Sequence, residues 1–89
     1  MNIYKIKYTI DLVSIAKGNN KIIDTDGREI LVSATSLEKA MLKTGKHAKK
    51  ENRDFNQFTV KDEKTGETAH YKYTNFEIAS CELVAESEI

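Results

Sequence analysis

The alternation of apolar and polar side chains over residues 3–12 constrains the fold more than any other feature of this chain. Its period of two is typical of a β-strand with one buried face. The apolar side chains on that face are Tyr4, Ile6, Tyr8, Ile10 and Leu12. The alternation changes phase between Leu12 and Val13, which predicts a β-bulge or a bend at that point. Other apolar elements must therefore cover one of the two faces of this strand.

Two alternatives remain open for residues 21–34. Asp26 and Gly27 together are a strong turn signal, so the region is either one long strand interrupted by a bulge or a short strand followed by a tight hairpin. Residues 28–34 are extended in both alternatives. Neither side of that segment is strongly polar, which favours a central position in the sheet for this strand.

Residues 35–53 have the pattern of an amphipathic helix. Thr35 and Glu38 match a capping box, which predicts a helix that begins at Ser36. The stripe expected to face the sheet consists of Leu37, Ala40, Met41, Thr44 and Ala48. The opposite stripe is cationic and consists of Lys39, Lys43, Lys46, Lys50 and Arg53. Gly45 disfavours the helix by roughly 1 kcal/mol, but we expect the helix to continue through it, because an earlier end would leave a long loop.

The period of two returns after the helix. The strands expected there are residues 58–60, 67–73 and 76–84. A hairpin turn at residues 62–66 separates the first two of these strands, and Thr74 with Asn75 separates the last two. We expect residues 85–89 to fray as an acidic tail.

These elements predict a single α+β domain over residues 1–89. One helix packs on a mostly antiparallel four- to five-stranded sheet, in two layers and in a ββαββ, β-grasp-like order. A length of 89 residues suits one domain with a small core, and a composition of 39% hydrophobic and 31% charged residues is typical of globular proteins. No apolar run approaches the ~18 residues of a membrane span, so we expect no membrane partner.

Catalytic and metal chemistry are not expected. His47 lies among lysines and His70 lies in a predicted strand, and neither has an orienting group apparent in the sequence. The single Cys81 excludes an intramolecular disulfide and a multi-cysteine zinc site, and predicts a reducing, cytoplasmic compartment. Residues 24–27 resemble the start of a calcium loop, but Thr35 stands where a bidentate glutamate is needed, so we interpret them as an acidic turn. We therefore expect no enzyme, no catalytic residues, no cofactor, no metal and no small-molecule substrate.

Sequence-nonspecific nucleic-acid binding is the alternative function. The five cations of the predicted helix follow one another at intervals of four, three, four and three residues, so they can follow the phosphates of a nucleic-acid backbone. Tyr71 and Tyr73 share one side of a predicted strand, with Lys72 between them, and offer rings for base stacking. The formal net charge of +0 weighs against this function.

Binding of another protein is the preferred function. The predicted sheet has an uncovered face and free edges, which suit strand addition or a homodimer. Residues 1–50 hold ten Lys and Arg against five Asp and Glu, whereas residues 51–89 hold four against nine. The acidic C-terminal strand and tail therefore form a second candidate surface for a protein partner. Its glutamates are Glu77, Glu82, Glu86 and Glu88.

The build of the chain is similar to that of accessory proteins encoded by phages and other mobile elements. This similarity rests on its short length, its lack of proline and its abundance of Lys, Asn and Ile. It involves no diagnostic motif and assigns no family. The sequence thus predicts a small, non-enzymatic accessory protein of the cytoplasm that binds an unidentified protein partner or a second copy of itself.

Overall fold

The structure is a computed structural model that describes residues 1–16 and 18–86. Its elements are β1 (Asn2–Ala16), β2 (Asn19–Ala34), α1 (Leu37–Glu51), the short turn η1 (Arg53–Phe55), β3 (Phe58–Lys61) and β4 (Thr68–Glu86). The four strands form one sheet in the order β2-β1-β4-β3, and every adjacent pair is antiparallel. The predicted α+β architecture with its ββαββ order is confirmed.

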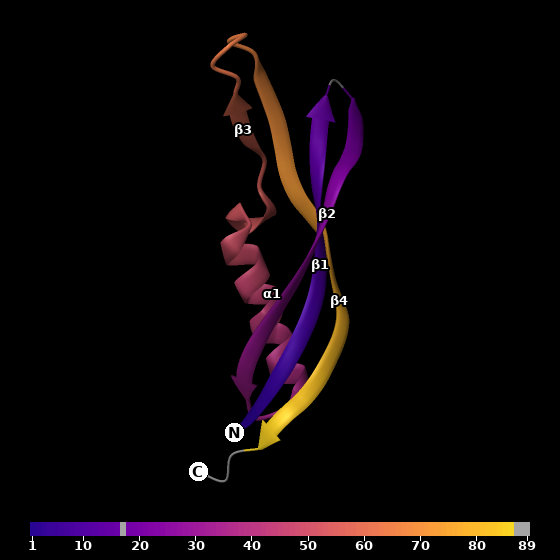
Figure 1. The fold of residues 1–89 in the computed structure, drawn as a ribbon, viewed down its shortest axis with the longest axis vertical. Helices are drawn as coiled ribbons and strands as arrows, with labels where there is room; N and C mark the ends of the chain where they lie inside the picture. The colour runs from indigo at the N-terminus through magenta and orange to yellow at the C-terminus, as the bar shows by residue number, and fades with distance from the viewer. Residues whose placement is uncertain (17, 87–89) are drawn as a thin grey trace.

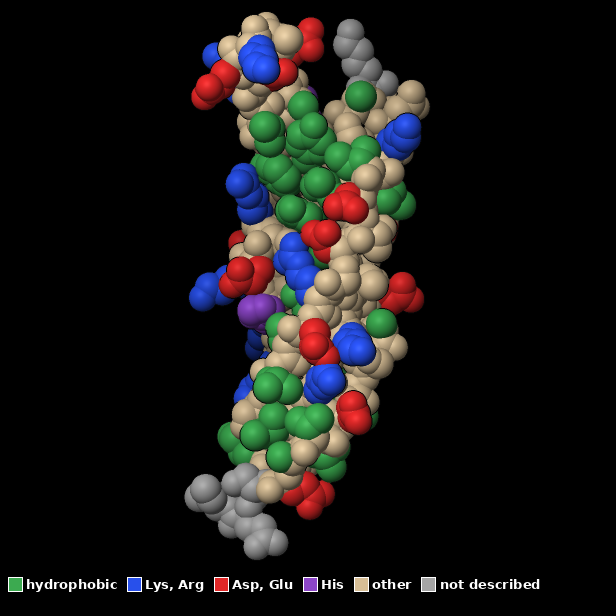
Figure 2. Space-filling view, in the orientation of Figure 1, with side chains coloured by type: hydrophobic (Ala, Val, Ile, Leu, Met, Phe, Trp, Pro, Cys, Tyr) green, Lys and Arg blue, Asp and Glu red, His purple; other side chains and the backbone are tan. Residues whose placement is uncertain are grey.

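The molecule is elongated, and its helix covers only part of one sheet face. The principal extents are 57 × 21 × 17 Å, and α1 lies beside one half of the sheet, whereas β3 pairs with β4 in the other half (Figure 1). Figure 2 shows hydrophobic side chains gathered in two areas, one toward each end of the long axis, with charged side chains between them. The fold therefore leaves apolar side chains accessible where the helix does not reach.

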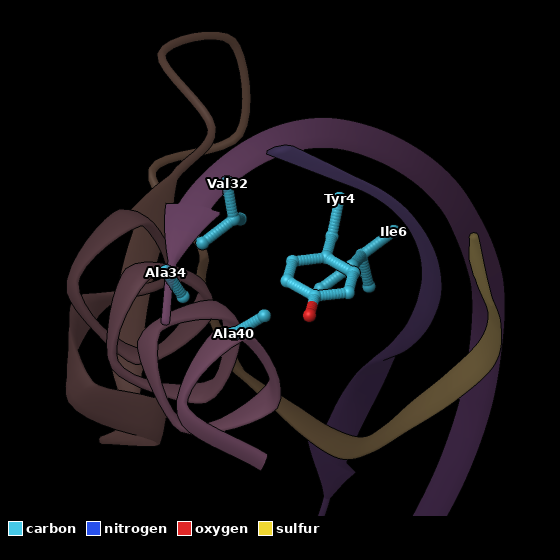
Figure 3. Close-up of a cluster of buried hydrophobic side chains, with 5 residues drawn as sticks. All are labelled: Tyr4, Ile6, Val32, Ala34 and Ala40. Carbon is cyan, nitrogen blue, oxygen red and sulfur yellow. The ribbon is translucent and has the colours of Figure 1, made fainter. Parts of the chain in front are cut away.

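β1 is the central strand on which the other elements assemble. It pairs with β2 on one side and with β4 on the other along nearly its whole length. Its helix-facing side chains Tyr4, Ile6, Tyr8 and Ile10 are at most 7% exposed. The alternation predicted for residues 3–12 is therefore confirmed. Figure 3 shows Tyr4 and Ile6 pointing into the space between the strands and Ala40 of the helix.

The helix packs on the sheet through small side chains. Ala40, Thr44 and Ala48 are completely buried, and the Thr44 hydroxyl donates to the Ala40 carbonyl at 2.8 Å, so this polar group is satisfied without water. The helix continues through Gly45, as predicted. A Cβ at this position would lie 3.9 Å from the ring of Phe76 in β4. Small residues thus let the helix lie close to the strands.

The prediction that Leu37 and Met41 face the core is wrong. Their side chains are 46% and 39% exposed. The buried side chains of α1 are Ala40, Thr44 and Ala48, all of them short, so Leu37 and Met41 lie outside the buried stripe. The buried stripe of the helix is therefore narrower than the stripe that the sequence predicts.

Both ends of the helix differ slightly from the prediction. Ser36, not Thr35, is the N-cap, because Ser36 has an extended backbone and its hydroxyl accepts the Lys39 N–H at 3.3 Å. At the other end α1 stops at Glu51. Arg53 therefore lies outside the helix, and its membership of a helical cationic stripe is wrong.

β2 is one continuous strand. Asp26 and Gly27 pair with Ile10 and Thr9 of β1 in the middle of β2, so the hairpin alternative and the acidic-turn interpretation are both wrong. The long pairing with β1 overrides the local turn preference of these two residues. The prediction of a central position is also wrong, because β2 forms one edge of the sheet.

The bulge predicted at the phase change of β1 is confirmed, with the extra residue on β2. Leu12 pairs with Asp24 and Val13 pairs with Ile22, so Ile23 has no direct partner on β1. The phase change in the apolar pattern of β1 therefore marks the position of a bulge whose extra residue lies in the neighbouring strand β2.

β4 is a single strand where two strands were predicted. Asn75 has a positive φ of 56°, which bends the strand without ending it, and the register with β1 shifts at this point. The Asn75 side chain donates to the Asp11 carboxylate at 2.9 Å. β4 continues to Glu86, which pairs with Asn2, so it includes two residues of the segment expected to fray; residues 87–89 lie outside the described part of the chain.

The close packing of the helix generates a first prediction. Ala48→Leu should lower the free energy of unfolding by about 1–3 kcal/mol, because the larger side chain must push α1 away from the sheet. The matched control is Lys46→Leu on the exposed side of the same helix, which should change the stability by less than about 0.5 kcal/mol. Denaturant unfolding measures both values, and equal stabilities for the two variants would contradict the packing described here.

A second prediction concerns Asp11, whose carboxylate joins three strands. The Thr25 hydroxyl donates to it at 2.7 Å and Asn75 donates to its other oxygen, and these hydrogen bonds lower the pKa of Asp11 below its ordinary value. The resulting stability is present at neutral pH and is lost as the pH falls through the folded-state pKa of Asp11.

Thr25→Val should therefore raise the pKa of Asp11 toward that of an ordinary aspartate. An NMR titration of the Asp11 carboxyl carbon measures this change. The control Thr59→Val, on the distant strand β3, should leave the pKa of Asp11 at its value in the original protein. An unchanged pKa of Asp11 in Thr25→Val would show that the hydrogen bond to Thr25 does not hold this carboxylate.

Candidate functional site

The described residues offer no cluster for metal binding. Among residues 1–16 and 18–86, no group of three His, Cys, Asp or Glu side chains is placed to hold a metal ion. His70 Nδ1 lies 3.2 Å from the side-chain amide of Gln57, and Cys81 faces the core beside Ile6. Burial raises the pKa of the Cys81 thiol, so it stays protonated at neutral pH. In the same part of the chain, no helix has the length and apolar character that crossing a membrane requires.

The predicted acidic surface on β4 is divided between two sheet faces. Glu77 and Glu82 pair across the sheet with Thr9 and Lys5, on the face that α1 leaves uncovered. Glu86 pairs with Asn2, which points to the opposite face. Glu88 lies outside the described residues. The described glutamates therefore do not form one continuous anionic surface.

The uncovered sheet face is polar in its middle part. Lys5 forms an ion pair with Glu29 at 3.3 Å, and Asp11 accepts the hydrogen bond from Thr25. Exposed ion pairs of this kind contribute little to stability, but they keep a sheet face hydrated. This face therefore does not need a protein partner to cover it.

The sheet has two long edges with different geometry. β3 pairs only with residues 68–71 of β4, so no described strand pairs with the outer edge of the rest of β4 or with the outer edge of β2. β4 has three register shifts against β1, whereas β2 is regular against β1 from Asp24 to Ala34. Bulges hinder the pairing of a further strand. The regular edge of β2 is therefore the better template for strand addition.

A groove follows this edge between β2 and α1. It has a volume of about 510 Å³. Its lining residues are Ile30, Leu31, Val32, Ser33, Lys43 and His47. The Lys43 ammonium donates to the Ser33 carbonyl at 2.6 Å, so the groove has a cation directly at the strand edge. We call this groove and the outer edge of residues 28–34 the β2 edge site.

The other predicted cations occupy two different places. Lys39, Lys46 and Lys50 are exposed on α1, as the helical pattern predicts. Arg53 lies in η1, where its guanidinium sits 4.4 Å from the centre of the Phe58 ring. Such a contact stabilises a cation over an aromatic face.

Arg53 belongs to an aromatic–arginine cluster at the end of the sheet that α1 does not cover. The cluster consists of Phe58, Tyr71, Tyr73, Arg53 and Arg28. The Phe58 ring centre lies 5.9 Å from that of Tyr71 and 5.8 Å from that of Tyr73, and Arg28 lies 5.9 Å from the Tyr73 ring. Sequence reasoning missed Phe58 and Arg28. Counting back across the predicted hairpin would have placed Phe58 opposite Tyr71, whereas nothing local indicates Arg28.

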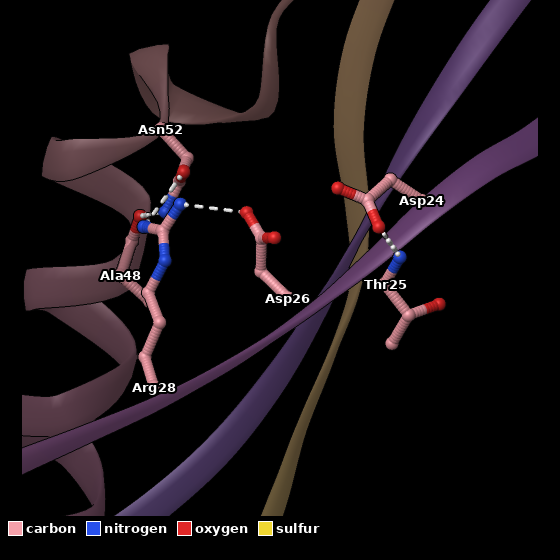
Figure 4. Close-up of polar contacts among 6 residues, drawn as sticks. All are labelled: Asp24, Thr25, Asp26, Arg28, Ala48 and Asn52. Atoms are coloured by element: carbon pink, nitrogen blue, oxygen red, sulfur yellow. Dashed lines mark hydrogen bonds and ion pairs between the residues drawn. The ribbon is translucent and has the colours of Figure 1, made fainter.

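A buried amide connects this cluster to the helix. Asn52 is 1% exposed, donates to the Ala48 carbonyl at 2.7 Å and accepts from Arg28 at 3.0 Å (Figure 4). Arg28 also pairs with Asp26 at 3.3 Å. Burial alone would lower the pKa of Arg28, but hydrogen bonds to Tyr8 and Asp26 raise it, so the guanidinium stays charged.

The turn η1 holds a strained backbone. Arg53, Asp54 and Phe55 have φ values of 57°, 55° and 59°, which lie in the left-handed region. Side chains with a Cβ pay roughly 1–2 kcal/mol each for this conformation. Strained backbone persists where the surroundings determine it and is concentrated at functional sites. Here the anchored Asn52 before the turn and the Phe58 contact after it fix the position of Arg53.

Comparison of the chain with protein-family profiles, with curated proteins and with solved structures finds no match. Two features of the described residues remain as candidate sites, the β2 edge site and the aromatic–arginine cluster.

The strain in η1 generates a third prediction. Asp54→Gly should raise the free energy of unfolding by roughly 0.5–1 kcal/mol, because glycine adopts a positive φ without the clash of a Cβ. The control is Asp62→Gly in the turn between β3 and β4, where the aspartate side chain accepts the Lys64 N–H at 2.8 Å and its loss should destabilise the protein. A less stable Asp54→Gly variant in denaturant unfolding would contradict the strained turn.

Proposed function

We propose that this protein binds a partner protein by strand addition, in which an extended acidic segment of the partner pairs with the outer edge of β2 between Arg28 and Ala34. The observation that carries the proposal is a regular strand edge, with which no described strand pairs, beside a groove with a cation. The single cysteine of the chain suits a partner in the reducing cytoplasm.

The backbone of β2 supplies the hydrogen bonds for the added strand. Because the Ser33 carbonyl accepts from Lys43 of the helix, it points away from β1. In an antiparallel strand the N–H and C=O of one residue point to the same side, and this side alternates along the strand. Glu29, Leu31 and Ser33 therefore direct their backbone groups outward. A partner strand can bond to those of Glu29 and Leu31, whereas the Ser33 carbonyl already accepts from Lys43.

The side chains on the two faces of this edge determine which residue types an added strand prefers at alternate positions. On the helix side, an added strand lies next to Ile30 and Val32 and faces Lys43 and His47, which favours acidic residues. On the other side it lies next to Leu31, which is 70% exposed and favours an apolar neighbour. The preferred segment therefore alternates acidic and apolar residues.

The expected affinity is moderate. Each main-chain hydrogen bond contributes about 0.5–1.5 kcal/mol, and complete burial of a leucine side chain contributes about 1.5–3 kcal/mol. Association and the ordering of a flexible segment oppose binding by several kcal/mol. A short peptide should thus bind with a Kd in the micromolar range, near −8 kcal/mol.

The fourth prediction tests the edge directly. Linear peptides selected from a displayed random library on this protein should alternate acidic and apolar residues, and Leu31→Pro should weaken their binding by at least roughly tenfold. Proline removes the outward N–H of Leu31 and places its ring in the path of the added strand, while the bonds between β2 and β1 remain. Calorimetry measures the affinities, and circular dichroism checks that the variant is folded.

Charge reversal on the helix provides the matched pair of variants. Lys43→Glu, in the groove, should weaken the selected peptides by roughly tenfold, whereas Lys49→Glu, on the opposite flank of α1, should change their affinity less than about twofold. Peptides that bind Leu31→Pro as tightly as the original protein would contradict strand addition. A dimer that Leu31→Pro dissociates would instead identify a second copy as the occupant.

A further inference from the structure

We propose that the aromatic–arginine cluster binds single-stranded nucleic acid, by stacking an unpaired base on Tyr71 while Arg53 contacts the adjacent phosphate. This site lies at the end of the sheet beyond α1, and the proposal is independent of the β2 edge site.

The three rings gather on one face of two adjacent strands. Phe58 of β3 pairs directly with Tyr71 of β4, so the two rings lie on the same sheet face, and Tyr73 stacks on Phe58 with an interplanar angle of 22°. Arginines lie over Phe58 and Tyr73, whereas among the described residues Tyr71 has only Phe58 as a ring neighbour. Tyr71 is half-buried and lines a surface hollow, so part of its ring is accessible to a base. Aromatic residues at such positions bind bases of any sequence, because every base has a π-face.

A hollow beside Tyr71 has room for the stacked base. Its volume is about 380 Å³. Its lining residues are Val60, Asp62, Glu67, Thr68, Ala69 and Tyr71. Figure 2 shows the hydrophobic side chains of this end of the molecule as one continuous exposed area over β3 and β4. An exposed apolar area on a small protein marks a binding surface.

The charges around the cluster orient the ligand. Asp62 and Glu67 at one end of the hollow repel phosphates, and Arg53 at the other side of Phe58 attracts them. The left-handed turn holds Arg53 at this place at a cost in backbone strain, which a purely structural arginine does not require. Few phosphates are contacted, so the binding is weak and depends only modestly on salt.

The test compares two fluorescent oligonucleotides of equal length, one of mixed-sequence single-stranded DNA and one with abasic sites throughout. Fluorescence anisotropy at low salt should show binding of the first and at least roughly tenfold weaker binding of the second, because both carry the same phosphates but only the first has bases. Equal binding of the two oligonucleotides would overturn the proposal, as would a lack of binding to both.

Two variants locate the binding on the protein. Tyr71→Leu should weaken binding of the mixed-sequence oligonucleotide by roughly tenfold. Arg53→Gln, which changes an exposed side chain, should weaken it by about fivefold even if Tyr71→Leu proves unstable. The matched control is Lys64→Gln, an exposed cation in the turn between β3 and β4, which should leave the affinity within about twofold. Loss of binding in Lys64→Gln or Leu31→Pro, with normal binding in Arg53→Gln, would assign the oligonucleotide to another surface and overturn the proposal.

Discussion

Burial of the helix-facing side chains of β1 is the interaction on which the rest of the structure depends. Tyr8, Ile6 and Ile10 are the largest apolar side chains that are fully buried, and the buried side chains of α1 are the small Ala40, Thr44 and Ala48. The helix has 15 residues, about 22 Å at 1.5 Å per residue, against a long axis of 57 Å. It therefore covers one half of the sheet face and leaves the aromatic–arginine cluster of the other half accessible.

The two edges of the sheet differ in regularity, and the proposed strand addition uses the more regular one. The bulges of β4 fit the long strand to β1 and make its outer edge irregular. β2 has one bulge, near the hairpin at the far end, so its edge beside α1 stays regular. Natural sheets usually protect such an edge. In this protein Lys43 contacts the backbone at Ser33 and leaves the neighbouring positions open, which is compatible with the proposed strand addition.

Local patterns predicted the parts of the fold that depend on neighbours in sequence. Three such predictions are confirmed: the alternation in β1, a bulge where β1 changes phase at Leu12, and the passage of the helix through Gly45. The errors come from contacts between distant segments. The bend of β4 lies at Asn75, whose side chain bonds to Asp11 of β1, and the left-handed turn η1 follows Asn52, which accepts from Arg28 of β2. The site residues divide in the same way. Exposure of the lysines follows from helical periodicity and the pairing of Phe58 with Tyr71 follows from the hairpin, whereas no local signal places Arg28 beside Tyr73.

Native-state amide hydrogen exchange along β2 tests most directly the central claim that this edge is open. The amides of Ile30 and Val32 point toward β1 and should exchange only through unfolding, whereas those of Leu31 and Ser33 point outward and should exchange close to the rate of an unfolded chain. Protection that alternates in this way from residue to residue is the predicted result. Equal, strong protection of Leu31 and Val32 in the free protein would show that the edge is already covered and would contradict the account.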